Sequence, residues 1–188
     1  MRERDTQRAR VYKCDAAVNN LAKPLPSVRD VERFVKKVFA SKRVQAAYPK
    51  AMRWTLPRVG DGRGRRNACG WQGGIKIPLW ARNEGVVLHE LAHTICMREG
   101  GNEAFHGWQF CSIYLRLVLY MMGREAHDAL KAAFKVNRVR FTKPRASKPL
   151  DPVRRAAMIA RLAEFRASRS SSRIDQGVAG RFGGLELT

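Results

Sequence analysis

The chain has 188 residues, 45% of them hydrophobic and 28% charged, which fits one globular domain with an appended segment and excludes collagen-like, fibrous and wholly disordered classes. Lys and Arg number 37 against 16 Asp and Glu, a formal net charge of +21, so the surface should attract polyanions such as nucleic acid. No run approaches the roughly 18 apolar residues of a membrane span, and the charged N-terminus lacks the apolar stretch of a secretory signal, so we expect a cytoplasmic protein.

The first third of the chain predicts two helices. Apolar residues recur at helical spacing over residues 5–20 and again over residues 27–47. Ser27 stands where a helix N-cap belongs, directly after a segment containing Pro24 and Pro26.

The pattern then changes to that of short strands. Apolar and polar residues alternate over residues 52–56, and two further strands, 68–71 and 74–80, follow a glycine-rich turn. Pro78 cannot donate a hydrogen bond to a neighbouring strand, so we expect the last of these strands at a sheet edge. Together with the helices, these strands predict an α+β fold with a small sheet.

Helices return in the second half of the chain. Asn83 and Asn102 are expected to cap the first two of them. The expected helices cover residues 84–98, 103–122, 124–137 and 152–167. A Ser/Arg/Gly-rich tail, residues 168–184, is expected to be flexible. We therefore expect a folded domain over residues 1–142 and a basic helix with a flexible tail over residues 143–188.

One predicted helix carries an HExxH sequence, from His89 through Glu90 to His93. Residues four positions apart lie one turn above each other on a helix, so both imidazoles can reach one metal ion from a single face. Glu90 can then reach a metal-bound water without ligating the metal itself. This spacing is typical of zinc metallopeptidases.

A catalytic zinc ion needs a third protein ligand and an open position for water. His106 follows His93 after a helix break at Gly100 and Gly101, and the next helix can fold back to bring it to the same point. The remaining histidine, His127, is expected to be a surface or packing residue. We predict one zinc ion per chain, held by the three clustered histidines.

The motif and its flanking segments resemble the SprT-like zinc metallopeptidases. The likeness rests on HExxH, on residues 105–110 (FHGWQF) with a phenylalanine three residues after the glycine, and on the glycine-led segment 73–80 (GGIKIPLW). Residues 4–12 (RDTQRARVY) are similar to a small family of metallohydrolases from actinobacteria and their phages, which would place the protein in the host cytoplasm if it is phage-encoded. The resemblance covers about residues 4–142.

This resemblance implies a compact zincin core of the minigluzincin type, with helices packed on a three-stranded antiparallel sheet. It implies that the three histidines bind zinc and that Glu90, as general base, activates a zinc-bound water for peptide-bond hydrolysis. An edge strand with Ile75, Lys76 and Ile77 would pair with an extended substrate. The chain lacks the C-terminal four-cysteine zinc ribbon of many relatives, so DNA-dependent substrate choice is less secure here.

Partners of the histidines are also expected, because metal-bound imidazoles are usually held by hydrogen bonds. Glu99 and Glu103 are candidates by proximity in sequence, although surface solvation is the commoner role of such residues. Tyr114, Arg116 and Tyr120 follow His106, and packing or surface charge is the expected role of each. The four cysteines show no metal-finger spacing and are expected to be reduced thiols.

Clusters of basic residues supply the competing interpretation. Seven of them could form one positive face that binds nucleic-acid phosphates: Lys36, Lys37, Lys42, Arg43, Arg63, Arg65 and Arg66. The protein would then be either a peptidase, with DNA-associated proteins as one candidate substrate class, or a nucleic-acid-binding protein on a zincin-like scaffold. Hydrolysis of a bond other than a peptide bond is a third alternative.

Overall fold

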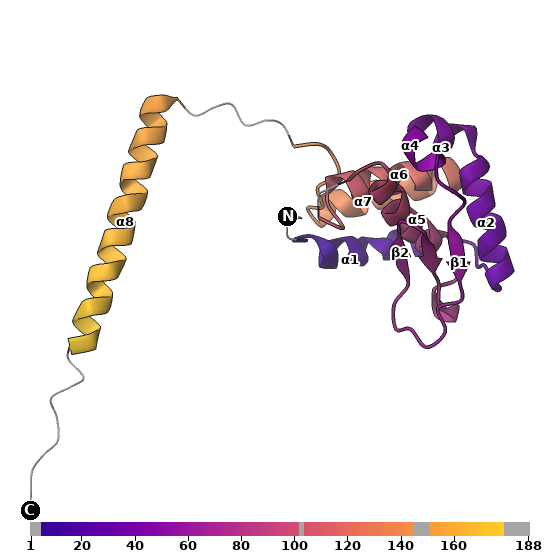
Figure 1. Ribbon diagram of the computed structural model, residues 1–188, viewed down its shortest axis with the longest axis horizontal. Coiled ribbons are helices and arrows are strands. Elements are labelled where there is room, and N and C mark those ends of the chain that lie inside the picture. The colour runs from indigo at the N-terminus through magenta and orange to yellow at the C-terminus, as the bar shows by residue number, and fades with distance from the viewer. Residues whose placement is uncertain (1–4, 102–103, 145–150, 179–188) are drawn as a thin grey trace, which may run out of the picture. The chain divides into compact units, whose positions relative to one another are not determined.

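A computed structural model describes residues 5–101, 104–144 and 151–178, with side chains described up to residue 166 (Figure 1). The chain divides into two compact units, Met1–Pro144 and Arg145–Thr188. The first unit contains helices α1 (Arg8–Asn19), α2 (Val28–Ala40), α3 (Lys42–Ala47), α4 (Pro49–Met52), α5 (Glu84–Arg98), α6 (Trp108–Met121) and α7 (Arg124–Val136), strands β1 (Arg58–Gly60), β2 (Cys69–Trp71) and β3 (Gly74–Lys76), and the 3₁₀-helix η1 (Leu79–Ala81). It is therefore a mixed α and β unit, as predicted.

The second unit is described through helix α8 (Pro152–Val178). The helix is longer than expected, because residues 168–178, predicted to be flexible, continue it. The remainder of the predicted flexible tail, residues 179–184, lies outside the described residues. Within the described segments, no helix combines the length and apolar character needed to cross a bilayer.

The predicted N-terminal helices form, with one interruption. The Ser27 hydroxyl accepts a hydrogen bond from the Asp30 N–H, and the Asp30 carboxylate accepts one from the Ser27 N–H, so a reciprocal capping box starts α2. The expected helix over residues 27–47 is interrupted at Ser41, whose backbone is extended and separates α2 from α3. The buried residues of α2 (Val31, Phe34, Val35, Val38 and Phe39) lie at the predicted helical spacing.

The strand predicted over residues 52–56 is wrong. Pro49 occupies the first position of α4, where its fixed φ and missing N–H are compatible with a helix, and α4 includes Met52. The first strand begins only at Arg58. Alternation over five residues was too short a signal to distinguish a strand from an irregular connection.

The sheet has the strand order β1-β3-β2 and is mixed, so the predicted antiparallel arrangement is wrong. β2 and β3 form an antiparallel hairpin, with Gly70 opposite Ile75, whereas β1 pairs in parallel with the other side of β3, with Val59 opposite Ile75. The prediction that β3 lies at an edge is also wrong. Pro78 follows the end of this strand, so its missing N–H places no constraint on strand order.

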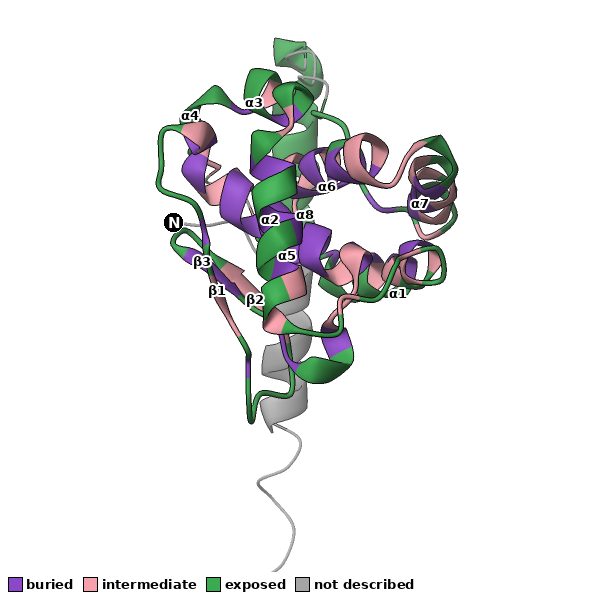
Figure 2. Ribbon diagram, turned by 90° about the vertical axis from the view of Figure 1, so that its right-hand side faces the viewer, coloured by how far each residue is buried: buried purple, intermediate pink, exposed green. Residues whose placement is uncertain are grey.

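Helix α5 forms the centre of the unit (Figure 2). Eleven of its residues are buried, so this helix is covered on several sides, by the sheet, by α1 and by α6. The Thr94 hydroxyl donates to the backbone oxygens of Gly74 and Glu90, at 3.3 and 3.2 Å, which ties α5 to β3. The HExxH residues are therefore held on the most enclosed helix of the described unit.

Candidate metal centre

Helix α5 presents His89 and His93 from one face, as the sequence predicted. The helix starts at a cap in which the Asn83 side chain accepts a hydrogen bond from the Val86 N–H, 2.9 Å away. Both imidazoles are buried, with 3% and 8% of their surface exposed. A capped, enclosed helix fixes the two rings one turn apart.

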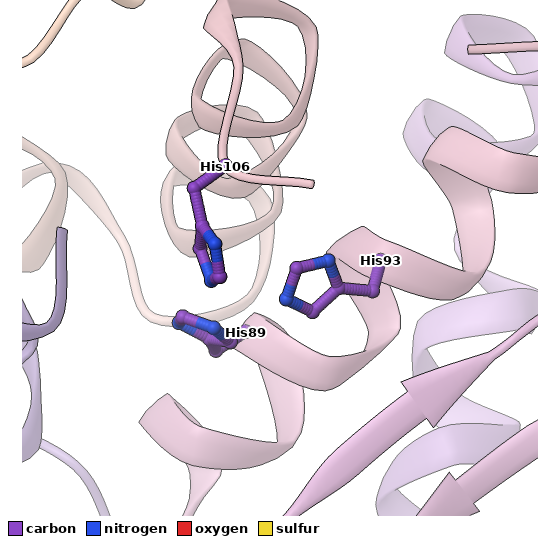
Figure 3. A group of neighbouring side chains, drawn as sticks. All are labelled: His89, His93 and His106. Carbon is purple, nitrogen blue, oxygen red and sulfur yellow. The ribbon is translucent and has the colours of Figure 1, made fainter. Parts of the chain in front are cut away.

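His106 reaches the same point from the connection between α5 and α6 (Figure 3). Gly100 has a φ of 83°, a conformation that glycine tolerates, and it turns the chain after the last residue of α5. Helix α6 starts at Trp108 instead of residue 103, so His106 lies in the turn that precedes it. The predicted cap Asn102 lies outside the described residues.

The three histidines fit a metal ion. One ring nitrogen of each lies within 4.8 Å of the other two. The Nε2 atoms of His89 and His106 are buried and have no hydrogen-bond partner among the residues that the structure describes, which is costly for a polar atom unless something else binds it. A buried set of imidazoles is the donor chemistry of zinc, copper, iron and nickel sites. These residues could thus hold one ion.

Aromatic rings pack around the imidazoles. Phe110 stacks on His93, with ring centres 4.2 Å apart and planes inclined by 27°. Tyr12 of α1 stacks on His89, with ring centres 5.6 Å apart and planes inclined by 19°, and also meets His106 edge-on at 5.1 Å. This packing limits rotation of the rings and therefore keeps their nitrogens directed at one place.

Glu90 lies next to the cluster with only 7% of its surface exposed. Burial raises the pKa of its carboxyl above the ordinary value, and Asp15 adds to this, while His89 and a backbone hydrogen bond from Gly70 oppose the shift. A carboxylate with a raised pKa can accept and release a proton closer to neutral pH. The Glu90 carboxyl group thus lies beside the histidines with a raised pKa.

Two aspartates contact the outer nitrogens of the histidines. Asp5 Oδ2 lies 2.7 Å from Nδ1 of His106, and both carboxylate oxygens of Asp15 lie 3.3 Å from Nδ1 of His89. Neither aspartate was predicted from the sequence, in which Glu99 and Glu103 were the candidates. Glu99 accepts a hydrogen bond from the Ala51 N–H at 2.7 Å, on α4, and Glu103 lies outside the described residues.

The aspartates act differently on the two rings. Burial disfavours a charged His89, but the Asp15 carboxylate and Glu90 outweigh it and raise the pKa of His89. At His106 burial prevails over the hydrogen bond to Asp5 and lowers the pKa, which favours the neutral form that a metal requires.

The sequence contained one indication that the N-terminal segment belongs to the site. Segment 4–12, which carries part of the family resemblance, contains both Asp5 and Tyr12.

Two adjoining hollows open the site to solvent, with volumes of about 280 and 230 Å³. Both are lined by Tyr12, Glu90 and residues 67 and 68, and the second also by Cys69 and Gly70 of β2. The predicted substrate-binding residues do not line either hollow. Ile75 and Ile77 are buried, β3 is paired on both sides, and the Ile77 N–H donates to the Gly60 oxygen, so Ile75, Lys76 and Ile77 offer no free strand edge.

The other predicted residues lie away from the cluster or pack beneath it. Tyr114 is fully buried, 5.3 Å from the His89 ring, and burial followed by Asp15 raises its pKa well above the ordinary value. His127 lies beside Asp128 on α7, outside the cluster.

All seven predicted nucleic-acid-binding side chains are exposed: Lys36 and Lys37 on α2, Lys42 and Arg43 on α3, and Arg63, Arg65 and Arg66 in the β1–β2 connection. That they form a single face stays a prediction.

Comparison of the chain with protein families, with curated proteins and with solved structures gives no match. The resemblance to SprT-like metallopeptidases therefore stays a prediction. The arrangement of the described residues is therefore the basis for the function proposed below.

Proposed function

We propose that the protein is a zinc-dependent metallopeptidase with one zinc ion per chain, held by His89, His93 and His106. The observation that supports this most is the juxtaposition of three buried imidazoles with a buried carboxylate, Glu90, which lines both of the open hollows. A purely structural metal site usually has four protein ligands, whereas a catalytic zinc site has three and leaves one position open.

Zinc bound there would polarise the scissile carbonyl and lower the pKa of a water molecule to about 7. Glu90 accepts the proton of the attacking water and returns it to the leaving amine nitrogen. The hydrogen bond from the Gly70 N–H orients the Glu90 carboxylate for this transfer. The rings of Tyr12 and Phe110 stack on the imidazoles of His89 and His93 and hold their orientation.

The position of β2 beside the two hollows favours a peptide in an extended conformation as the substrate. In the described sheet β2 is an edge strand, paired with β3, and residues 67–70 line the second hollow beside Glu90. A peptide added along this edge would gain backbone hydrogen bonds without regard to its sequence. The substrate edge thus moves from the predicted residues 75–77 to β2. DNA-associated proteins remain one candidate class of substrate.

The test is the variant Glu90→Gln, compared with wild type for zinc content and for cleavage of unfolded proteins and a peptide library. We expect the zinc content to stay unchanged and the rate to fall by about 10²–10⁴-fold, the usual contribution of a general base. Glu84→Gln in the first turn of the same helix is the matched control and should keep the wild-type rate. An undiminished rate in Glu90→Gln would refute the assigned base, and a zinc-loaded wild type without peptide hydrolysis would refute the peptidase.

Nucleic-acid binding is the second candidate, favoured by one observation. Arg63 and Arg65 line a hollow together with Trp80, a tryptophan with 66% of its surface exposed. Arginines bind phosphates and an exposed indole can stack on a base. This candidate predicts DNA binding that weakens steeply with salt, is unaffected by Glu90→Gln and occurs without peptide hydrolysis. DNA titrations of the full chain at several salt concentrations, with Arg63→Ser/Arg65→Ser as the test variant, distinguish the two candidates.

A further inference from the structure

The N-terminal segment supplies two carboxylates to the candidate metal centre. Asp5 precedes α1 and Asp15 lies within it, and each contacts the Nδ1 atom of a different histidine. Only 19% of the Asp5 side-chain surface and 16% of the Asp15 side-chain surface are exposed to solvent. These two contacts join positions 101 and 74 residues apart in the chain, so they depend on how α1 packs.

Each contact determines which nitrogen of the ring remains for a metal. A neutral imidazole carries one hydrogen, and a carboxylate beside Nδ1 draws that hydrogen to Nδ1. The lone pair then resides on Nε2, and within the described part of the chain the Nε2 atoms of His89 and His106 are buried without a hydrogen-bond partner. Both rings therefore have their outer nitrogen engaged and their inner nitrogen available.

The segment that carries the aspartates is held firmly. The buried Gln7 amide donates to the His106 backbone oxygen at 2.6 Å and to the Arg140 oxygen at 3.0 Å, and its own oxygen accepts the Arg140 N–H. Val11, Cys14 and Val18 of α1 are buried in the core. Because Gln7 joins residue 106 to the residues after α7, Asp5 and His106 are fixed relative to each other.

We propose that Asp5 and Asp15 are positioning residues of the metal centre, which hold His106 and His89 in the tautomer and orientation that direct Nε2 to the ion. Their negative charges also offset the charge of a divalent cation bound by neutral imidazoles. The inference rests on the metal site of the proposed function but not on peptide hydrolysis. Helix α1 would thus belong to the candidate metal centre, although the three candidate ligands lie on α5 and in the connection between α5 and α6.

The first test is zinc affinity, measured by competition with a chromophoric chelator on the full chain. Partners of this kind usually contribute 10–100-fold to metal affinity, so Asp5→Ala and Asp15→Ala should each weaken zinc binding by about that factor. Asp5→Asn and Asp15→Asn should lose less, since an amide oxygen can still accept the hydrogen bond but carries no charge. Asp128→Ala is the matched control, because Asp128 Oδ1 lies 2.7 Å from Nδ1 of His127 outside the cluster, and it should leave zinc affinity unchanged.

The second test measures the tautomer of His89 and His106 by NMR, in the absence of a metal ion. Long-range ¹H–¹⁵N spectra of the apoprotein, recorded at alkaline pH so that both rings are neutral, should show the hydrogen of His89 and His106 on Nδ1, and the alanine variants should shift it toward Nε2. The isosteric asparagine variants cover the case in which an alanine variant does not fold, as judged by circular dichroism. Zinc affinities of Asp5→Ala and Asp15→Ala within twofold of wild type, or Nε2-protonated rings in wild type, overturn the inference while leaving the metal site intact. A wild type that binds no zinc overturns the proposed function itself.

Discussion

Gly70 of β2 lies against Glu90 of α5 so closely that a Cβ atom on Gly70 would stand 2.2 Å from the Glu90 backbone oxygen. This is far inside van der Waals contact, and the obstacle is main chain, which cannot move aside without shifting α5. The close approach also brings the Gly70 N–H to the Glu90 carboxylate. A glycine therefore determines how near the edge strand comes to the candidate general base.

Gly70→Ala should lower the free energy of unfolding by about 1–3 kcal/mol, because the added methyl group overpacks the interface between β2 and α5. Urea denaturation measures the change. Gly60→Ala in β1 is the matched control, since its Cβ would meet the flexible Lys76 side chain at 3.2 Å, and its stability should change by less than about 1 kcal/mol. Equal losses in the two variants would contradict the close approach of Gly70.

Removal of zinc should lower the thermal stability of the protein. The buried Nε2 atoms of His89 and His106 lack hydrogen-bond partners in the segments that the structure describes, so a bound ion would stabilise the folded state, by about 2.7 kcal/mol at a free zinc concentration 100 times the dissociation constant. Melting curves with added zinc and with excess chelator measure this difference. His106→Ala should abolish the zinc-dependent shift and sharply reduce zinc content measured by mass spectrometry, whereas His127→Ala should retain both. Identical melting curves of the wild type with and without zinc contradict the prediction.

Arg98, at the end of α5, should contribute strongly to stability. Only 5% of its surface is exposed, and its guanidinium donates hydrogen bonds to the backbone oxygens of Gln72, at 2.8 Å, and Ala51, at 3.4 Å. Arg98→Met leaves both carbonyl oxygens without this donor and should cost about 2–4 kcal/mol in the free energy of unfolding. Arg43→Met on the exposed surface of α3 should change stability by less than about 0.5 kcal/mol. A loss at Arg98 no larger than at Arg43 would contradict this role.

The capping box of α2 predicts a pH-dependent contribution to stability. Hydrogen bonds from Ser27, together with the contact with Arg33, lower the pKa of Asp30 from 3.8 to about 2. Because the folded pKa is the lower one, the stabilisation is complete above about pH 4 and is lost as the pH falls toward 2. Ser27→Ala should cost about 1 kcal/mol at neutral pH. The stability difference between wild type and Asp30→Asn, measured by urea denaturation, should shrink between pH 4 and pH 2, and a constant difference would contradict the assignment.

Local sequence patterns were sufficient for several parts of this structure. Helical spacing of apolar residues predicted α1, α2, α5 and α7, and the caps Ser27 and Asn83 marked two helix starts correctly. The HExxH spacing placed two histidines and a carboxylate on one turn, and the break at Gly100 indicated how His106 joins them. These features follow from hydrogen bonds and side-chain directions within a few residues, which the local sequence specifies.

Tertiary packing decided the rest. The order of strands is set by which edges pair once the hairpin packs on α5, so no pattern within residues 74–80 could reveal that β3 lies between β1 and β2. The contacts of Asp5 with His106 and of Asp15 with His89 likewise join distant segments, and they form only when α1 packs beside α5. Local sequence alone was enough to identify the three candidate metal ligands and the candidate base, because they lie on one helix turn and just after one helix break. Only the folded chain revealed the two carboxylates that contact the candidate ligands and the edge position of β2 in the described sheet, because packing brings those groups together from positions that share no local pattern.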